Sequence, residues 1–97
     1  MSVREKMTRV EGDKRGDIAL YALSTCGWCR KTKGLLGEIG VEYDYVDVDL
    51  LGEADRKEAL DEIKVHNPQC SFPTMVIDND RCIVGFKEQE VREALSG

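Results

Sequence analysis

The sequence predicts an α/β fold in which a mixed four-stranded sheet carries helices on both faces. The first observation is the apolar run IALYAL within residues 17–23, typical of a buried strand, which is followed by apolar residues at helical spacing. The second is a pair of short apolar runs around the turn Asp78-Asn79-Asp80, which indicates an antiparallel hairpin. Together they predict the order β-α-β-α-β-β-α, with a right-handed parallel crossover at the start and the hairpin near the end.

The first half of the chain supplies the first strand, a helix and a second strand. After a break at 24–27, residues of one helical face recur every three or four positions up to Gly40, where the helix should end. These residues are Cys29, Thr32, Leu36 and Ile39. Residues 41–50 alternate Val and Tyr with acidic residues, which is typical of a half-buried strand.

The second half of the chain supplies a helix, the hairpin and a last helix. Residues 53–65 place Ala54, Leu60 and Ile63 on one side among charges, which predicts a half-exposed helix. The hairpin strands are the apolar runs MVI and CIVGF, and residues 87–95 then form a short helix.

The domain organisation follows from length. A chain of 97 residues supports one hydrophobic core, which we assign to residues 17–97. Residues 1–16 have no sustained period and contain Gly12 and Gly16. We therefore expect them to form a mobile or weakly ordered arm, or a poorly specified extra strand.

Composition and charge exclude several classes of partner. The 14 basic and 19 acidic residues give a net charge of -5, so no nucleic acid partner is expected. No apolar run approaches the roughly 20 residues of a membrane-spanning helix, and the N-terminal residues contain no apolar core of a secretory signal. We expect a soluble, cytoplasmic monomer with no membrane partner.

A dithiol motif, Cys26-Gly27-Trp28-Cys29, lies where the first strand turns into a helix. Four cysteines without an export signal indicate reactive thiols or a metal site more than a disulfide framework. The free N–H groups and dipole of a helix N-terminus favour a thiolate at Cys26, which would be the nucleophile. Cys29, one turn further in, should stay protonated until it attacks a mixed disulfide at Cys26.

Two other functions use the same pair of cysteines or only the fold. In a zinc or iron–sulfur module, Cys26 and Cys29 would be ligands, and zinc would need Cys70 and Cys82 to converge on them. In a redox-inactive adaptor, the fold would serve only as a docking surface. His66, the only histidine, is interpreted as a surface residue at a helix end.

Basic residues follow the dithiol along the helix. Arg30 and Lys33 come four and seven residues after Cys26, on its side of the helix, where they would favour the anion and attract acidic partners. The alternative is that Arg30, Lys31 and Lys33 form a solvated helix face.

Two further motifs complete the pattern. Phe72-Pro73-Thr74 precedes the third strand, and Val84-Gly85-Phe86 precedes the last helix. A proline before a buried strand is either a simple strand entry or a cis proline that exposes neighbouring backbone groups. In this order, the dithiol and these two motifs resemble the glutaredoxin branch of the thioredoxin-like superfamily over residues 17–96.

This resemblance implies a thioredoxin-like fold and a dithiol–disulfide oxidoreductase that carries electrons to protein disulfides. Cys26 and Cys29 would be catalytic, and Pro73 would be cis beside the Cys26 sulfur. The substrate-binding residues would be Trp28, Phe72, Pro73, Gly85 and Phe86, with the backbone at Phe72 pairing to an extended substrate. No cofactor is expected to be bound, because glutathione or a thioredoxin-reductase-type flavoprotein would act as external reductant.

The sequence departs from the glutathione-using members of the family. They have a Lys three residues before the first Cys, a Thr-Val-Pro segment, and Gly-Gly followed by acidic residues. Here the corresponding residues are Leu23, Ser71-Phe72-Pro73 and Gly85-Phe86-Lys87-Glu88. The Gly-Phe pair is instead similar to redoxins that supply ribonucleotide reductase and accept electrons from a thioredoxin reductase.

The other two cysteines have separate interpretations. Cys70, three residues before Pro73, is either a third redox thiol or a half-buried loop residue. Cys82 lies in an apolar strand and is interpreted as an inert core residue.

Overall fold

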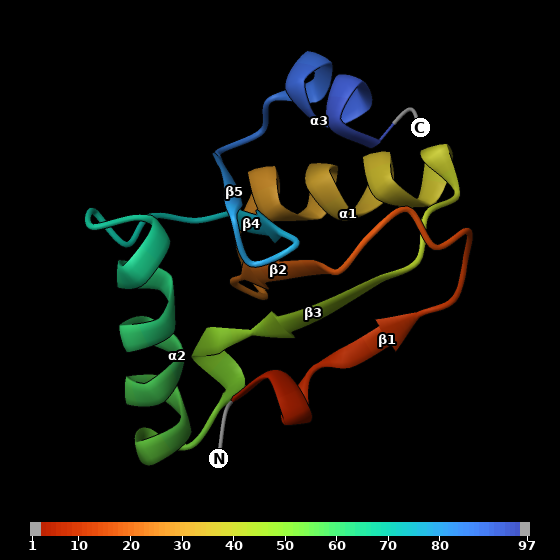
Figure 1. Cartoon of the computed structure of the whole chain (residues 1–97). Helices are drawn as coiled ribbons and strands as arrows, with labels where there is room; N and C mark the ends of the chain where they lie inside the picture. The colour runs from red at the N-terminus through yellow and green to blue at the C-terminus, as the bar shows by residue number, and fades with distance from the viewer. Residues whose placement is uncertain (1–2, 96–97) are drawn as a thin grey trace.

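The computed structural model describes residues 3–95 and places a sheet between two layers of helix (Figure 1). The strands are β1 (Thr8–Val10), β2 (Ile18–Ala22), β3 (Tyr43–Asp47), β4 (Thr74–Ile77) and β5 (Arg81–Val84). The helices are α1 (Gly27–Ile39), α2 (Glu53–His66) and α3 (Glu88–Leu95), with short 3₁₀ turns η1 (Val3–Lys6) and η2 (Val48–Leu50). Residues 1–2 of the expected arm and 96–97 of the expected domain lie outside the described residues.

The strands are arranged in the order β1-β3-β2-β4-β5. β2 and β3 are parallel and are connected by α1, whereas every other neighbouring pair is antiparallel. β2 is the central strand, and all five of its residues are buried. The predicted parallel crossover and the predicted hairpin of β4 and β5 are therefore both confirmed.

The prediction of four strands is wrong, because β1 adds a fifth strand at the edge beside β3. β1 has only three residues, and its first two are exposed, so its sequence has no apolar period that could reveal a strand. Arg9 on β1 forms a salt bridge with Asp44, its partner on β3 (3.0 Å). The division of the chain between residues 16 and 17 stays a prediction.

Beyond β1, the chain packs against the end of α1. The Asp13 N–H donates to the Gly40 carbonyl, and the Glu42 N–H donates to the Asp13 carbonyl, both at 2.8 Å. A Cβ on Gly12 would lie 2.6 Å from the Val41 carbonyl carbon, so only glycine allows this approach. Gly40 ends α1 in the left-handed conformation (φ 84°), as the sequence predicts for a helix C-terminus.

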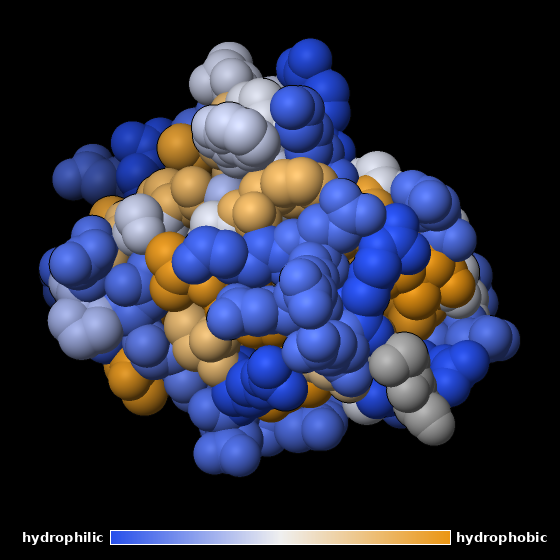
Figure 2. All heavy atoms as spheres, turned by 90° about the horizontal axis from the view of Figure 1, so that it is seen from above, coloured by the Kyte–Doolittle hydropathy of each residue, from blue (hydrophilic) through white to orange (hydrophobic). Residues whose placement is uncertain are grey.

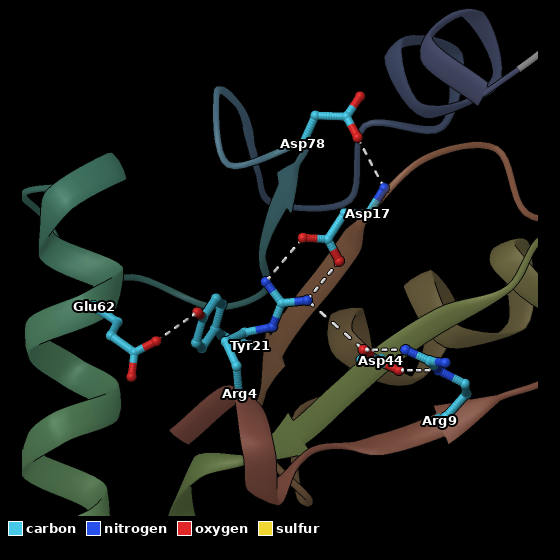
Figure 3. Close-up of polar contacts among 7 residues, drawn as sticks. All are labelled: Arg4, Arg9, Asp17, Tyr21, Asp44, Glu62 and Asp78. Carbon is cyan, nitrogen blue, oxygen red and sulfur yellow. Dashed lines mark hydrogen bonds and ion pairs between the residues drawn. The ribbon is translucent and has the colours of Figure 1, made fainter. Parts of the chain in front are cut away.

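A polar network fastens the N-terminal segment to the sheet (Figure 3). The Arg4 guanidinium contacts Asp17 at 2.6 Å and Asp44 at 3.7 Å. Hydrogen bonds from Arg9 and the nearby Arg4 charge hold the pKa of the Asp44 carboxyl below its ordinary value. The Asp17 N–H in turn donates to Asp78 at the hairpin turn (2.8 Å). Individual exposed ion pairs add little stability, but this network joins η1, β1, β2 and the turn.

Apolar residues form two cores, one on each face of the sheet. On one face α1 and α3 cover the sheet, and their buried residues include Cys29, Leu35, Leu36, Val91 and Leu95. On the other face α2 and η1 contribute Val3, Ala59 and Ile63. Helices therefore lie on both faces, as predicted (Figure 1). Seen from above, the surface is mostly hydrophilic, with apolar residues in separate patches (Figure 2), as expected for half-exposed helices.

The second predicted strand is shorter than expected. Residues 41–50 were predicted as one strand, but β3 ends at Asp47 and the chain then turns through η2. η2 buries Val48 and leaves Leu50 70% exposed. In α2 the predicted Ile63 is buried and the predicted Leu60 is half-buried, but Ala54 is exposed and Ala59 is buried in its place.

Candidate active site

The two cysteines of the dithiol lie at the start of α1, just beyond the end of β2. The chain turns between Leu23 and Cys26, where the Cys26 N–H donates to the Leu23 carbonyl (3.2 Å). Cys26 is the N-cap residue of α1, and its Sγ accepts the backbone N–H of Cys29 at 3.2 Å. The sulfur therefore takes the place of a capping oxygen, with a helix N–H and the positive end of the helix dipole directed at it. Both features stabilise a negative charge on that sulfur.

Cys29 is in the opposite environment. It is 1% exposed, and both cysteines are free thiols in this structure. Burial, followed by the interaction with Cys26, raises the pKa of the Cys29 thiol to about 12, although the charge of Lys33 acts against this. At neutral pH Cys29 is therefore a protonated thiol, whereas Cys26 is half-exposed and adjoins the helix N-terminus.

The burial of Cys29 should make the reduced protein lose stability as the pH rises from about 9 towards about 12. The pKa of this thiol is higher in the folded than in the unfolded chain. Between the two pKa values the unfolded chain releases its proton while the folded chain retains it, so the free energy of unfolding decreases as the pH rises. Below both values this contribution to stability is fully present. Urea unfolding of the parent and of Cys29→Ala, measured at several pH values, would check this. The variant should lose less stability over this range. Tyr21, whose pKa is also raised to about 12, is present in both proteins and would give both the same pH dependence. Superimposable pH profiles would therefore contradict the assignment of the loss of stability to Cys29.

A shallow hollow of about 230 Å³ lies beside the dithiol, and we call it the first hollow. It is lined by all five residues that the resemblance implies for substrate binding: Trp28, Phe72, Pro73, Gly85 and Phe86. The ring of Trp28 is stacked on that of Phe86, with centroids 6.0 Å apart, yet Trp28 remains 57% exposed. The Phe72–Pro73 peptide bond is cis, as expected. The structure brings these residues together, and their binding role stays a prediction.

Buried hydrogen bonds fix the loops that carry these residues. The Gly85 N–H donates to the Pro73 carbonyl (2.8 Å), and Gly85 has φ 83°, which glycine adopts without strain. Thr74 is buried, and its hydroxyl donates to the Ser71 carbonyl (2.6 Å). The buried Asn67 side chain donates to the Thr74 hydroxyl (3.1 Å). These bonds hold Pro73 at the start of β4, next to the end of β5.

The basic residues of α1 do not share one environment. Arg30 and Lys31 are exposed, and the Lys31 Nζ lies 4.6 Å from the centroid of the Trp28 ring. Lys33 is half-buried, because its Nζ pairs with Asp47 (2.9 Å) and lies over a tyrosine ring of β3. Lys33 is therefore part of the packing between α1 and β3, and only Arg30 and Lys31 belong to a solvated face.

The structure also shows a contact that the sequence analysis missed. Asp49 on η2 accepts the N–H of Ser24 at 2.8 Å and its hydroxyl at 2.5 Å, which fixes the chain two residues before Cys26. These hydrogen bonds lower the pKa of the Asp49 carboxyl below its ordinary value. The sequence contains a pattern that could have predicted this contact. Ser24 and Asp49 each follow one of two parallel strands, and the carboxyl ends of parallel strands meet at one edge of a sheet.

A second hollow of about 300 Å³ lies on the other side of Phe72. It is lined by Leu23, Val48, Asp49, Arg56, Leu60 and Phe72. Phe72 therefore borders both hollows, and Leu23 follows directly after the last residue of β2. Leu23, Leu60 and Phe72 were named from the sequence, but only Phe72 was assigned to a binding surface.

The remaining cysteines lie outside both hollows. Cys70 is half-buried with φ 52°, and its Sγ is 3.9 Å from the Leu60 carbonyl oxygen. Cys82 is half-buried on β5, where burial raises the pKa of its thiol. Within residues 3–95, no group of three or more His, Cys, Asp or Glu residues is placed to hold a metal ion. The convergence of four cysteines that a zinc site would need is not formed in this part of the chain.

Comparisons with known proteins agree with this geometry. The sequence profile of the Glutaredoxin family matches residues 18–83. The structure resembles methanoredoxin of Methanosarcina acetivorans (49% identity, TM-score 0.86, covering 89% of this chain and 90% of that one). It also resembles the glutaredoxin of Methanosarcina mazei Go1 (48% identity, TM-score 0.88, covering 94% and 88%).

A sequence relative is an uncharacterized glutaredoxin-like 8.6 kDa protein in the rubredoxin operon of Clostridium pasteurianum. It is 35% identical over 74 residues, which are 76% of this chain and 91% of the relative. The solved structures confirm the predicted thioredoxin-like fold. None of the helices within residues 3–95 is long and apolar enough to span a membrane.

Proposed function

Because this chain belongs to the glutaredoxin family, we propose that it is a dithiol–disulfide oxidoreductase that reduces protein disulfides through a mixed disulfide at Cys26. The observation that carries the proposal is the contrast between the two sulfurs. Cys26 Sγ caps a helix and accepts an N–H at 3.2 Å, whereas Cys29 is buried with a raised pKa. One sulfur is thus suited to attack and the other to wait as a thiol.

The reaction consists of two exchanges. The Cys26 thiolate attacks one sulfur of the substrate disulfide, the substrate S–S bond breaks, and the released substrate sulfur takes up a proton. Cys29 then gives up its proton and attacks the Cys26 sulfur, which forms the Cys26–Cys29 disulfide and releases the second substrate thiol. The substrate gains two electrons and two protons, and the dithiol loses them.

The first hollow would hold the substrate chain during these exchanges. The backbone at Phe72 would pair with an extended segment of the substrate, as a strand pairs at a sheet edge. The Trp28 and Phe86 rings form one wall of the hollow, and aromatic walls supply large contact areas with little loss of side-chain entropy. Disulfide-containing proteins are therefore the proposed substrates. Three other expectations stay predictions: ribonucleotide reductase as a partner, the cytoplasmic location and the monomeric state.

The oxidised dithiol must be reduced by an external donor, and we expect a thioredoxin-reductase-type flavoprotein to be a better donor than glutathione. Phe86 occupies the place where glutathione-using members resemble one another in a second glycine, and its ring is packed on Trp28. The test offers the oxidised protein either glutathione with its reductase or a thioredoxin reductase with NADPH, and follows NADPH consumption. Faster recovery with glutathione would contradict this choice of donor, and recovery with neither would contradict the proposed function.

A further inference from the structure

The two hollows lie on either side of Phe72, whose backbone is the proposed pairing site for the substrate. Both are lined mainly by apolar side chains: aromatic rings in the first, and Leu23, Val48 and Leu60 in the second. An extended chain that passes Phe72 would place residues from both sides of its reactive cysteine in these hollows, because the chain advances about 3.3 Å per residue. The surface is therefore suited to a segment with apolar residues flanking the cysteine.

Exposed cations border both hollows, and Lys87, next to Phe86, lies near the first one as well as Lys31. At the first hollow, Lys31 lies over the Trp28 ring. In the lining of the second, the Arg56 Nη2 donates to the backbone carbonyls of Asp49 (3.3 Å) and Leu51 (3.2 Å). Among residues 3–95, neither Lys31 nor Arg56 forms an ion pair with a carboxylate.

Asp49 also lines the second hollow, and hydrogen bonds from Ser24, with a smaller contribution from the Arg56 charge, lower the pKa of its carboxyl. Both oxygens of Asp49 accept hydrogen bonds from Ser24. The first turn of α1 contains no acidic residue. The exposed cations at the hollows thus contrast with the net charge of -5 of the whole chain. Such a local contrast attracts acidic partners to one surface and disfavours basic ones.

We propose that this site selects acidic protein segments: disulfides whose reactive cysteine has apolar neighbours followed by carboxylate side chains that contact Lys31 and Arg56. The inference rests on the proposed function, since it specifies the substrate of the same dithiol. The Arg56 Nη2 donates to neutral backbone carbonyls and to no carboxylate, so the other N–H groups of the guanidinium could donate charge-assisted hydrogen bonds to a carboxylate of the substrate.

The experiment compares three synthetic peptide disulfides with the same Leu-flanked cysteine and outer residues of Glu, Gln or Lys. For the full chain, kcat/KM should decrease from the Glu to the Gln to the Lys peptide, with about a three- to tenfold difference between the extremes at low salt. Raising the ionic strength should reduce this ratio, because the charges are exposed and are screened. A purely structural effect of the cations would not depend on salt in this way.

Variants that remove the charge of Lys31 or Arg56 test whether these two cations cause the preference for the Glu peptide. Arg56→Gln and Lys31→Gln should each lower the Glu-to-Lys ratio, the double variant should bring it close to one, and Arg56→Lys should retain most of it. The matched control is Lys57→Gln, which removes the same charge from the next position of α2. Lys57 is outside both hollows and its side chain is 82% exposed, so this variant should keep the ratio of the parent.

The outcomes distinguish the two proposals. Equal rates for the Glu and Lys peptides, or a ratio that persists in the double variant, would overturn the acidic-substrate proposal while leaving disulfide reduction in place. If none of the three peptides were reduced by the parent, the proposed function itself would be contradicted.

Discussion

Replacing Cys26 with serine should abolish disulfide reduction, with a decrease in turnover of about a thousandfold or more, as for other nucleophile replacements. A serine hydroxyl is not ionised at neutral pH, so the helix N–H at this position would have no anion to stabilise. Cys29 cannot replace Cys26, because it is 1% exposed and its burial raises the pKa of its thiol. The measurement is the initial rate of insulin disulfide reduction, corrected for the rate without protein.

The matched control is Cys82→Ser, which makes the same chemical change on β5, outside both hollows. This variant should reduce insulin at the rate of the parent. Circular dichroism of both variants would establish that they are folded. If Cys26→Ser retained the parent rate, the nucleophile would have to be another group and the mechanism would be wrong.

Much of the first hollow was predictable because its residues belong to motifs that are local in sequence. The dithiol follows the most apolar strand directly, so a strand-to-helix turn predicts that Cys26 caps a helix. Phe72-Pro73 and Gly85-Phe86 come from separate loops, and only the resemblance brought them to the dithiol. Once β4 and β5 form a hairpin, Thr74 faces Val84, and the residues just outside this pair meet at one end of it.

From the sequence, an extra strand within residues 1–16 was expected only as an alternative to an arm, and there is a physical reason why that strand could not be placed. β1 is held by pairing with β3 and by ion pairs of Arg4 and Arg9, not by an apolar period of its own. Such contacts join residues that are far apart in sequence, and a three-residue edge strand has too few positions to show alternation.

The second hollow was missed for the same reason. Leu23, Arg56 and Leu60 come from the end of β2 and from one side of α2, whose position depends on the turn at η2. Alternating Val and Asp at residues 46–49 fits both a longer strand and the observed turn, because Val46 and Val48 are buried in either case. The sequence therefore predicted the helix-capping position of Cys26 and the aromatic residues of the first hollow, but not the charged end of the surface beside them.

Replacing Cys29 with serine should separate attack from resolution and should trap the substrate. The hydrogen bond to Cys26 Sγ comes from the backbone N–H of residue 29, which a serine retains, so Cys26 should still attack. Without the thiol at position 29 the mixed disulfide has no internal partner, so turnover should fall while about one substrate chain per protein accumulates in disulfide linkage. Intact mass spectrometry before and after dithiothreitol would measure the adduct.

The comparison with Cys26→Ser makes this result specific. Cys26→Ser should accumulate no adduct, because the attacking sulfur is absent, whereas an adduct through Cys70 or Cys82 would form equally in both variants. Rapid turnover without an adduct in Cys29→Ser would show that Cys29 does not resolve the mixed disulfide. Because the two sulfurs differ chiefly in burial and in the N–H directed at Cys26, opposite results from the two serine variants would link that difference in environment directly to a difference in role.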